Sequence, residues 1–103
     1  MQNIVSIAED QVREAVLRAA GEAVAAGELP AEPMPAFVVE VPGDRTHGDY
    51  AVNAAMVSAR AFRRAPRQIA DALLKHLDLT GTFLEKAEVA GPGFLNFFLA
   101  PSY

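Results

Sequence analysis

The sequence contains no cysteine, so disulfide bonds and thiolate metal sites are excluded and a cytoplasmic location is favoured. It also lacks any apolar run close to the ~18 residues that a membrane-spanning helix needs. The N-terminal residues do not show the basic and then apolar order of a signal peptide. We therefore expect a cytoplasmic protein without a membrane partner.

Length and composition indicate one globular domain over residues 1–103. Hydrophobic residues make up 51% of the chain and charged residues 21%, which is enough apolar material for a single core. The net charge of −4 argues against tight, non-specific binding to polyanions. Residues 44–67, however, hold five arginines against two aspartates, a local charge of +3. Because an RNA contact depends on the local field, the overall charge does not exclude RNA.

The first half of the chain predicts a helix, a connector and a strand. Small apolar residues recur at three- and four-residue steps over 6–26, which predicts a helix capped by Ser6 and Glu9 and ended by Gly27. A proline-rich connector follows it. The β-branched and aromatic run 36–41 predicts a strand with Phe37, Val39 and Val41 on one face.

The second half predicts two helices and a hairpin. The second helix is expected over about 49–63, and the third from Pro66 to about Leu77, with Ile69 and Leu73 in its buried stripe. Residues 85–90 and 94–99 flank Gly91-Pro92-Gly93, which predicts a β-hairpin. The fold class expected from this order is α+β, with two layers and the helices packed on one face of a small, mainly antiparallel sheet.

The last strand carries the candidate binding site. Side chains alternate along a strand, so Leu95, Phe97 and Leu99 form a core face, while the opposite face places Asn96 beside aromatic rings. A ring that stacks on a base, beside an amide that bonds its edge, is what recognition of a single-stranded base requires. We expect Phe94 and Asn96 to form such a site. The structural alternative is an amide among core aromatics that bonds nearby backbone.

Four arginines near the join of the second and third helices are candidate contacts for RNA phosphates. They are Arg60, Arg63, Arg64 and Arg67. A solvated polar edge is the ordinary interpretation of such residues.

His47 and Asp49 could be a general base and its orienting carboxylate, but no nucleophile lies in an obvious motif nearby. Two ligands are also too few for a metal site, so neither a catalytic nor a metal centre is expected. The favoured interpretation is structural, with Asp49 or Thr46 capping the second helix and Gly48 allowing a sharp turn. His76 is expected at the end of the third helix or on the surface.

Two blocks of sequence together carry a family resemblance. HGDYAVNAAMVSARAFRRAPRQIADALLKHL (47–77) and VAGPGFLNFFLAPSY (89–103) resemble the N-terminal additional domain of arginyl-tRNA synthetases. The two blocks cover about two-thirds of the chain, in the family's order.

This resemblance implies a domain that contacts the elbow of tRNA-Arg and recognises a D-loop base, usually adenine, through Phe94 and Asn96. Gly91 occupies a turn position that supplies a side-chain contact in some members, and here that contact is missing. The parent enzyme joins arginine to tRNA using ATP, commonly as a cytoplasmic monomer. Its catalytic domain would lie elsewhere in the same polypeptide, because HIGH- and KMSKS-type motifs are absent from this sequence, so no cofactor is expected here. The alternative function is a protein-docking domain that uses the Phe94/Phe98 face.

Overall fold

The computed structural model describes residues 4–32, 34–42 and 48–99. Three helices and four strands follow one another in the order α1 (Ile4–Ala25), β1 (Val39–Glu40), β2 (Tyr50–Val52), α2 (Ala54–Phe62), α3 (Pro66–His76), β3 (Leu84–Ala90) and β4 (Phe94–Leu99). The strands form one sheet in the order β1-β2-β4-β3, and every neighbouring pair is antiparallel.

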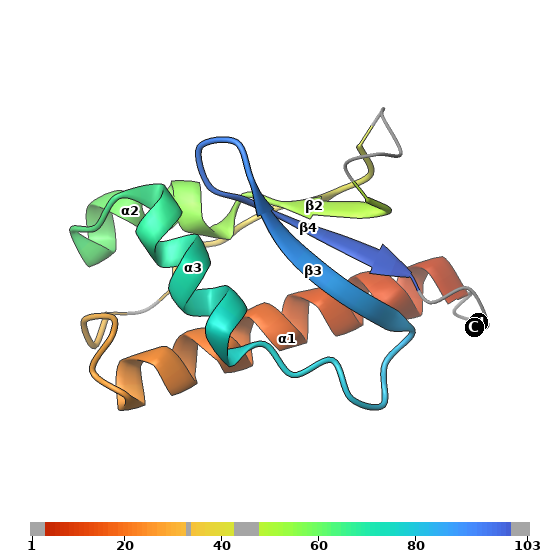
Figure 1. Ribbon diagram of the computed structural model, residues 1–103, viewed down its shortest axis with the longest axis horizontal. Coiled ribbons are helices and arrows are strands. Elements are labelled where there is room, and N and C mark those ends of the chain that lie inside the picture. The colour runs from red at the N-terminus through yellow and green to blue at the C-terminus, as the bar shows by residue number, and fades with distance from the viewer. Residues whose placement is uncertain (1–3, 33, 43–47, 100–103) are drawn as a thin grey trace.

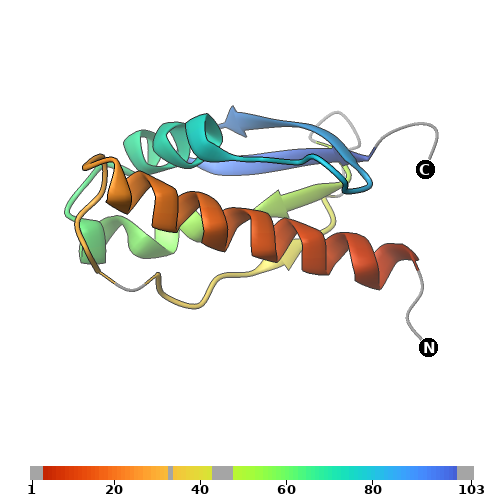
Figure 2. The ribbon, with the colours of Figure 1, turned by 90° about the horizontal axis from the view of Figure 1, so that it is seen from below.

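The predicted α+β architecture is confirmed. Helix α1 runs along the length of the molecule and across the sheet, while α2 and α3 lie at one end, next to the turn between β3 and β4 (Figures 1 and 2). Val52, Leu95 and Phe97, which face the helices from β2 and β4, are fully buried in the same core as the helix residues, and Leu99 packs against this core half-buried. The opposite face of the sheet is covered by none of the described helices and is called the open face below (Figure 2). None of the described helices combines the length and apolar character needed to cross a bilayer.

Helix α1 buries the small-residue face that its periodicity predicts, and Val12, Val16 and Ala19 are fully buried. The helix ends as predicted at Gly27, whose φ of 79° is the left-handed conformation that glycine favours. The amide of Glu28 donates to the carbonyl of Ala23 at 2.8 Å, and that of Gly27 donates to the carbonyl of Val24 at 3.0 Å, which is the Schellman pattern. The predicted start was wrong, since the helix begins at Ile4 and Ser6 lies inside its first turn.

Residues 50–52 form strand β2, so the prediction that the second helix begins near residue 49 was wrong. Tyr50 and Val52 alternate with Ala51 and enter the core, and β2 pairs with β4 along its whole length. Helix α2 begins only at Ala54. The Asn53 side chain before it accepts a hydrogen bond from the Val38 amide at 2.8 Å, so it ties β2 to β1 instead of capping the helix.

The strand predicted over 36–41 shrinks to Val39–Glu40. Phe37 is buried as predicted, and the Arg13 guanidinium both donates to its carbonyl at 3.1 Å and lies over its ring. Val41, predicted on the same buried face, is 63% exposed, because β1 has already ended. Helix α3 and the hairpin match their predicted bounds within about one residue, and Ile69, Ala70 and Leu73 are buried.

His76 ends α3, as predicted, and forms part of a cluster that joins this helix to the segment after α1. The Glu28 carboxylate accepts hydrogen bonds from Lys75 Nζ at 3.1 Å and His76 Nε2 at 3.0 Å. These contacts, with the His76 hydrogen bond contributing most, lower the pKa of Glu28 below its ordinary value of 4.5. The cluster therefore fastens α3 to the segment after α1 through an ionised carboxylate.

We predict that Glu28→Gln removes part of the acid sensitivity of folding. Because the pKa of Glu28 is lower in the folded state, its stabilisation is complete above its unfolded pKa and is lost as the pH falls through its folded pKa. Urea denaturation at about pH 6 and about pH 3 should show a smaller fall in unfolding free energy for Glu28→Gln than for the wild type. Glu32→Gln, at an exposed residue without an ion pair among the described residues, is the control. Equal falls in all three proteins would contradict the prediction.

Candidate nucleic-acid interface

Strand β4 has the two faces that alternation predicts. Leu95 and Phe97 are fully buried on the helix side. Phe94, Asn96 and Phe98 lie on the open side, where Phe94 and Phe98 are half-buried and Asn96 is 5% exposed. The sheet thus holds an amide among aromatic residues on the face that none of the described helices covers.

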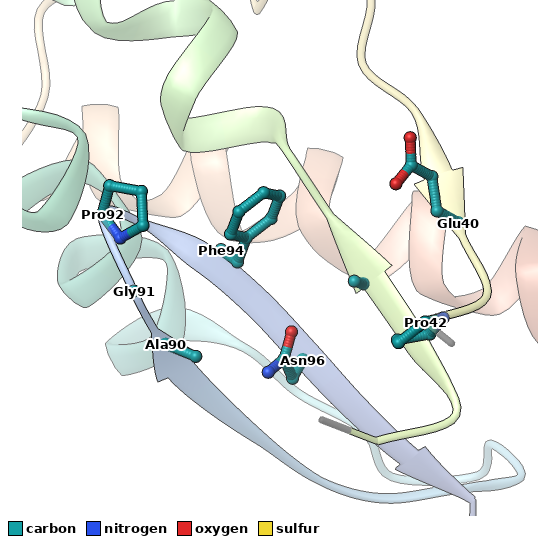
Figure 3. A pocket seen from close by; sticks show the side chains of 8 residues that line it. Glu40, Pro42, Ala90, Gly91, Pro92, Phe94 and Asn96 are labelled. Carbon is teal, nitrogen blue, oxygen red and sulfur yellow. The ribbon is translucent and has the colours of Figure 1, made fainter. Parts of the chain in front are cut away.

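A pocket of about 460 Å³ opens on this face of the sheet. That volume lies within the roughly 300–1,000 Å³ usual for small-ligand sites. Figure 3 shows Phe94 and Asn96 on β4, with Pro92 on one side and Glu40 and Pro42 on the other. The lining residues are Glu40, Pro42, Ala51, Ala90, Gly91, Pro92, Phe94 and Asn96. The structure therefore brings the two predicted base-binding residues into one pocket.

The side-chain amide of Asn96 is not used by the described part of the fold. None of the hydrogen bonds within the described part of the chain involves it. Among the described residues, every side-chain nitrogen or oxygen that is fully enclosed has a hydrogen-bond partner. Because the Asn96 amide atoms have no such partner, they are not fully enclosed, and they are accessible from the pocket that Asn96 lines. The predicted structural alternative, an amide bonded to nearby backbone, is therefore not seen in this part of the chain. A buried amide that keeps its donor and its acceptor free is suited to a polar ligand.

Close backbone packing fixes the turn that precedes Phe94. Gly93 has a φ of 146°, and a Cβ there would lie 2.9 Å from Pro66 Cβ and 3.0 Å from Pro66 C and O. This glycine lets the β3–β4 turn lie directly against the start of α3. Gly91, in the same turn, has a φ of 56°, and a Cβ there would meet only Phe94 Cδ2, at an ordinary contact distance of 3.8 Å. The pocket wall is thereby anchored to a helix terminus.

The four predicted phosphate contacts are all exposed, but their surroundings differ. Arg67 Nη1 donates to the carbonyl of Gly91 at 3.0 Å, which links α3 to the pocket rim. Arg64 Nη1 lies 3.4 Å from the carbonyl of Phe62 and 3.3 Å from that of Arg63. Arg63 takes the left-handed conformation that ends α2, with a φ of 54°. Among these four arginines, and within the described residues, only Arg67 is thus tied to the pocket by a hydrogen bond.

We predict that Arg67→Ala loosens the turn. The loss of its hydrogen bond should lower the unfolding free energy by about 0.5–1.5 kcal/mol. Arg60→Ala removes the same charge from the exposed side of α2, without breaking any bond to the turn, and should change stability by less than about 0.5 kcal/mol. Chemical denaturation of both variants measures the difference. Equal losses would show that the bond to Gly91 does not stabilise the turn.

The structure tests the predicted roles of Gly48 and Asp49, which lie just before β2. Gly48 has a φ of 93°, and a Cβ there would lie 2.7 Å from the Phe97 carbonyl oxygen, so the prediction that this position needs glycine is confirmed. Asp49 does not cap α2, because the N-cap residue of this helix is Asn53 and no side chain caps it. The Asp49 carboxylate accepts a hydrogen bond from the Leu99 amide at 2.9 Å and so fastens β4. Thr46 and His47 lie outside the described residues. Within the described part of the chain, no three His, Asp or Glu side chains form a metal-binding group.

Comparison with known protein families shows the family of this chain. Residues 7–99 match the family described as "Arginyl tRNA synthetase N terminal domain". The chain belongs to this family. The matched region includes every element of the fold apart from the first residues of α1.

Relatives of this arginyl-tRNA synthetase N-terminal domain agree with the assignment. The arginine–tRNA ligase of Acetivibrio thermocellus is 40% identical over 103 residues, which cover all of this chain and 18% of the relative. That of Desulfitobacterium hafniense is 48% identical over 95 residues, covering 92% of this chain and 17% of the relative. A solved structure, Thermus thermophilus arginyl-tRNA synthetase, matches 89% of this chain and 14% of its own with a TM-score of 0.65 and 28% identity. The chain spans less than a fifth of these proteins.

Several pocket residues of this synthetase domain were missed from the sequence, Glu40 and Ala51 among them. Ala51 was placed in the second helix, and Glu40 was placed with Val38 on the strand face opposite Phe37, Val39 and Val41. The alternation of Tyr50, Ala51 and Val52 was the available signal, since it predicts a short strand as well as a helix start. Only the pairing of β2 with both β1 and β4 brings the two residues beside Asn96.

Proposed function

We propose that this domain recognises a single-stranded base of the D-loop at the elbow of tRNA-Arg. In this proposal the base stacks on Phe94, and its edge forms hydrogen bonds with Asn96. The observation that carries the proposal is the Asn96 amide, which is 5% exposed, has no partner among the described residues and is accessible from the pocket. An amide that can donate and accept at once suits the edge of adenine.

The parent protein, in the same proposal, is an ATP-dependent arginine–tRNA ligase. Relatives of that name contain this domain in less than a fifth of their length, so the catalytic domain would lie elsewhere in the polypeptide. ATP and arginine would then bind outside this domain, which contributes selection of the tRNA. The ligase would act in protein biosynthesis, as a cytoplasmic monomer.

Arg60, Arg63 and Arg64 supply the phosphate contacts in this proposal, because they are exposed around the end of α2. Arg67 begins the neighbouring helix and already holds the turn, so it joins the phosphate-binding region to the pocket. Contacts of this kind position the RNA but do not distinguish its bases.

Docking of a protein on the Phe94/Phe98 face has weaker support. Lys86 Nζ lies 4.6 Å from the centre of the Phe98 ring, and Gly48 packs against the same ring. Phe98 is therefore partly covered within the domain, and Asn96 separates it from Phe94 on the strand. The face does not present one continuous aromatic patch.

Removal of the base tests the proposal. We expect the chain to bind tRNA-Arg with adenosine at the D-loop position more tightly than tRNA-Arg with an abasic residue there, by about 1–3 kcal/mol, from the loss of stacking. Fluorescence titration at a fixed salt concentration gives both dissociation constants. An abasic residue at another D-loop position should have no such effect. Equal affinity for the intact and abasic molecules would refute base recognition by this domain.

A further inference from the structure

Four residues lie in register across the open face of the sheet. Glu40 on β1 pairs with Ala51 on β2, Ala51 pairs with Asn96 on β4, and Asn96 pairs with Glu88 on β3. Residues directly opposite one another in antiparallel strands share a face. The row therefore holds a carboxylate, a methyl group, an amide and a second carboxylate.

Ala51 leaves a hollow in this row. Neighbouring strands are about 4.7–4.9 Å apart, so β1 and β4 lie roughly 10 Å apart on either side of the Ala51 methyl. Glu40, Ala51 and Asn96 all line the pocket. The edge of a planar ring can thus enter over Ala51 with Asn96 on one side and Glu40 on the other.

Glu40 supplies the only charge among the described residues that line the pocket. It is exposed, and its carboxylate has no ion pair or hydrogen bond within the described part of the chain. An ionised carboxylate accepts hydrogen bonds and donates none. Glu40 therefore favours a ligand edge that donates, and it disfavours both phosphate and a carbonyl oxygen.

We propose that Glu40 is a specificity-determining residue of this pocket, which selects an exocyclic amino group of the bound base. The proposal rests on the proposed function, since it takes the base pocket as given. An amino group has two N–H bonds. Asn96 Oδ1 accepts one of them, while Asn96 Nδ2 donates to the adjacent ring nitrogen, and the Glu40 carboxylate accepts the other. A 6-aminopurine satisfies all three contacts, whereas a 6-oxopurine turns its carbonyl oxygen towards a carboxylate.

The carboxylate also fixes how the nucleotide enters. Phosphate is repelled from the β1 side of the pocket by Glu40, while Arg67 lies at the opposite rim, bonded to Gly91. The base therefore points towards β1 and the RNA backbone remains on the side of α3.

Substitution of Glu40 by glutamine tests this role, with tRNA-Arg that carries adenosine or inosine at the D-loop position as the two probes. Inosine replaces the 6-amino group with a 6-oxo group. The wild type should prefer adenosine. Glu40→Gln should lower this preference by about tenfold, because the glutamine amide can rotate to donate to the oxygen, and a charge-assisted bond is lost.

Glu88→Gln is the matched control. Glu88 is also beside Asn96 in the row, but it lies outside the pocket lining and pairs with Lys86 at 3.2 Å. Its substitution should leave the adenosine-to-inosine ratio unchanged. An equal loss of preference in Glu40→Gln and Glu88→Gln would overturn the proposal, since it would show a general charge effect.

Asn96→Ala separates the two proposals. If Glu40→Gln keeps the full wild-type preference while Asn96→Ala lowers it, Glu40 is not a determinant and base recognition stands. If the wild type binds the two probes equally, selection of the amino group fails, and the comparison with the abasic tRNA decides separately whether a base is recognised. Titration of the three variants and the wild type with both probes gives all the ratios in one experiment.

Discussion

Asn96→Ala should lower the preference for adenosine over inosine at the D-loop position of tRNA-Arg by about 1–3 kcal/mol, the usual contribution of an amide–base pair. Its stability should hardly change, because the amide has no partner among the described residues. An amide bonded to backbone would give the opposite result, a loss of about 1–3 kcal/mol of stability when its partner is left unpaired. Titration and urea denaturation of the same preparation measure the two quantities.

Asn53→Ala is the control for this prediction. It makes the same chemical change at an amide that the fold does use, since Asn53 Oδ1 accepts from the Val38 amide at 2.8 Å. Asn53→Ala should lower the unfolding free energy by about 0.5–1.5 kcal/mol and leave the base preference unchanged. If Asn96→Ala loses stability but keeps the base preference, the prediction is wrong and the role of Asn96 is purely structural.

Gly93→Ala should destabilise the fold by about 2–4 kcal/mol, from backbone strain together with overpacking. The φ of 146° is a conformation that L-residues rarely adopt, and the added Cβ would lie 2.9 Å from Pro66 Cβ and 3.0 Å from Pro66 backbone atoms. None of these Pro66 atoms lies at the end of a flexible side chain, so the turn must move away from α3 to relieve the contact. Thermal or urea denaturation measures the loss.

Gly91→Ala is the control that separates the cost of the steric contact from the cost of the backbone conformation. Gly91 has a φ of 56°, and the nearest atom to an added Cβ is Phe94 Cδ2 at 3.8 Å, an ordinary contact distance. Its substitution should cost only about 1–2 kcal/mol, the strain of the left-handed conformation alone. A loss in Gly93→Ala no greater than that in Gly91→Ala would contradict the close packing of the turn on Pro66.

The elements that the sequence predicts well are those whose own periodicity determines their burial. Val12 and Val16 in α1, and Ile69 and Leu73 in α3, recur at helical spacing, and all four are fully buried. The hairpin could be predicted equally well from the sequence, because Gly91-Pro92-Gly93 separates two runs of strand-forming residues. Alternation along the second run also placed Phe94 and Asn96 on the face where the pocket lies.

The parts that the sequence did not predict depend on contacts between distant segments. Three residues of β2 give too short a pattern to separate a strand from a helix start, and pairing with β4, more than forty positions later, decides the outcome. The same pairing places Ala51 in the pocket and Glu40 across from it. The bond from Arg67 to Gly91 likewise joins a helix to a turn, so no local pattern indicates it.

The most direct test of base recognition on the open face of the sheet is an NMR titration of the ¹⁵N-labelled chain with tRNA-Arg. Binding should shift the side-chain amide signals of Asn96 and the backbone signals of residues 90–96, while α1 stays unchanged. tRNA-Arg with an abasic D-loop residue should leave the Asn96 side-chain signals in place. Shifts confined to α1, or Asn96 signals that respond equally to both RNAs, would contradict the account.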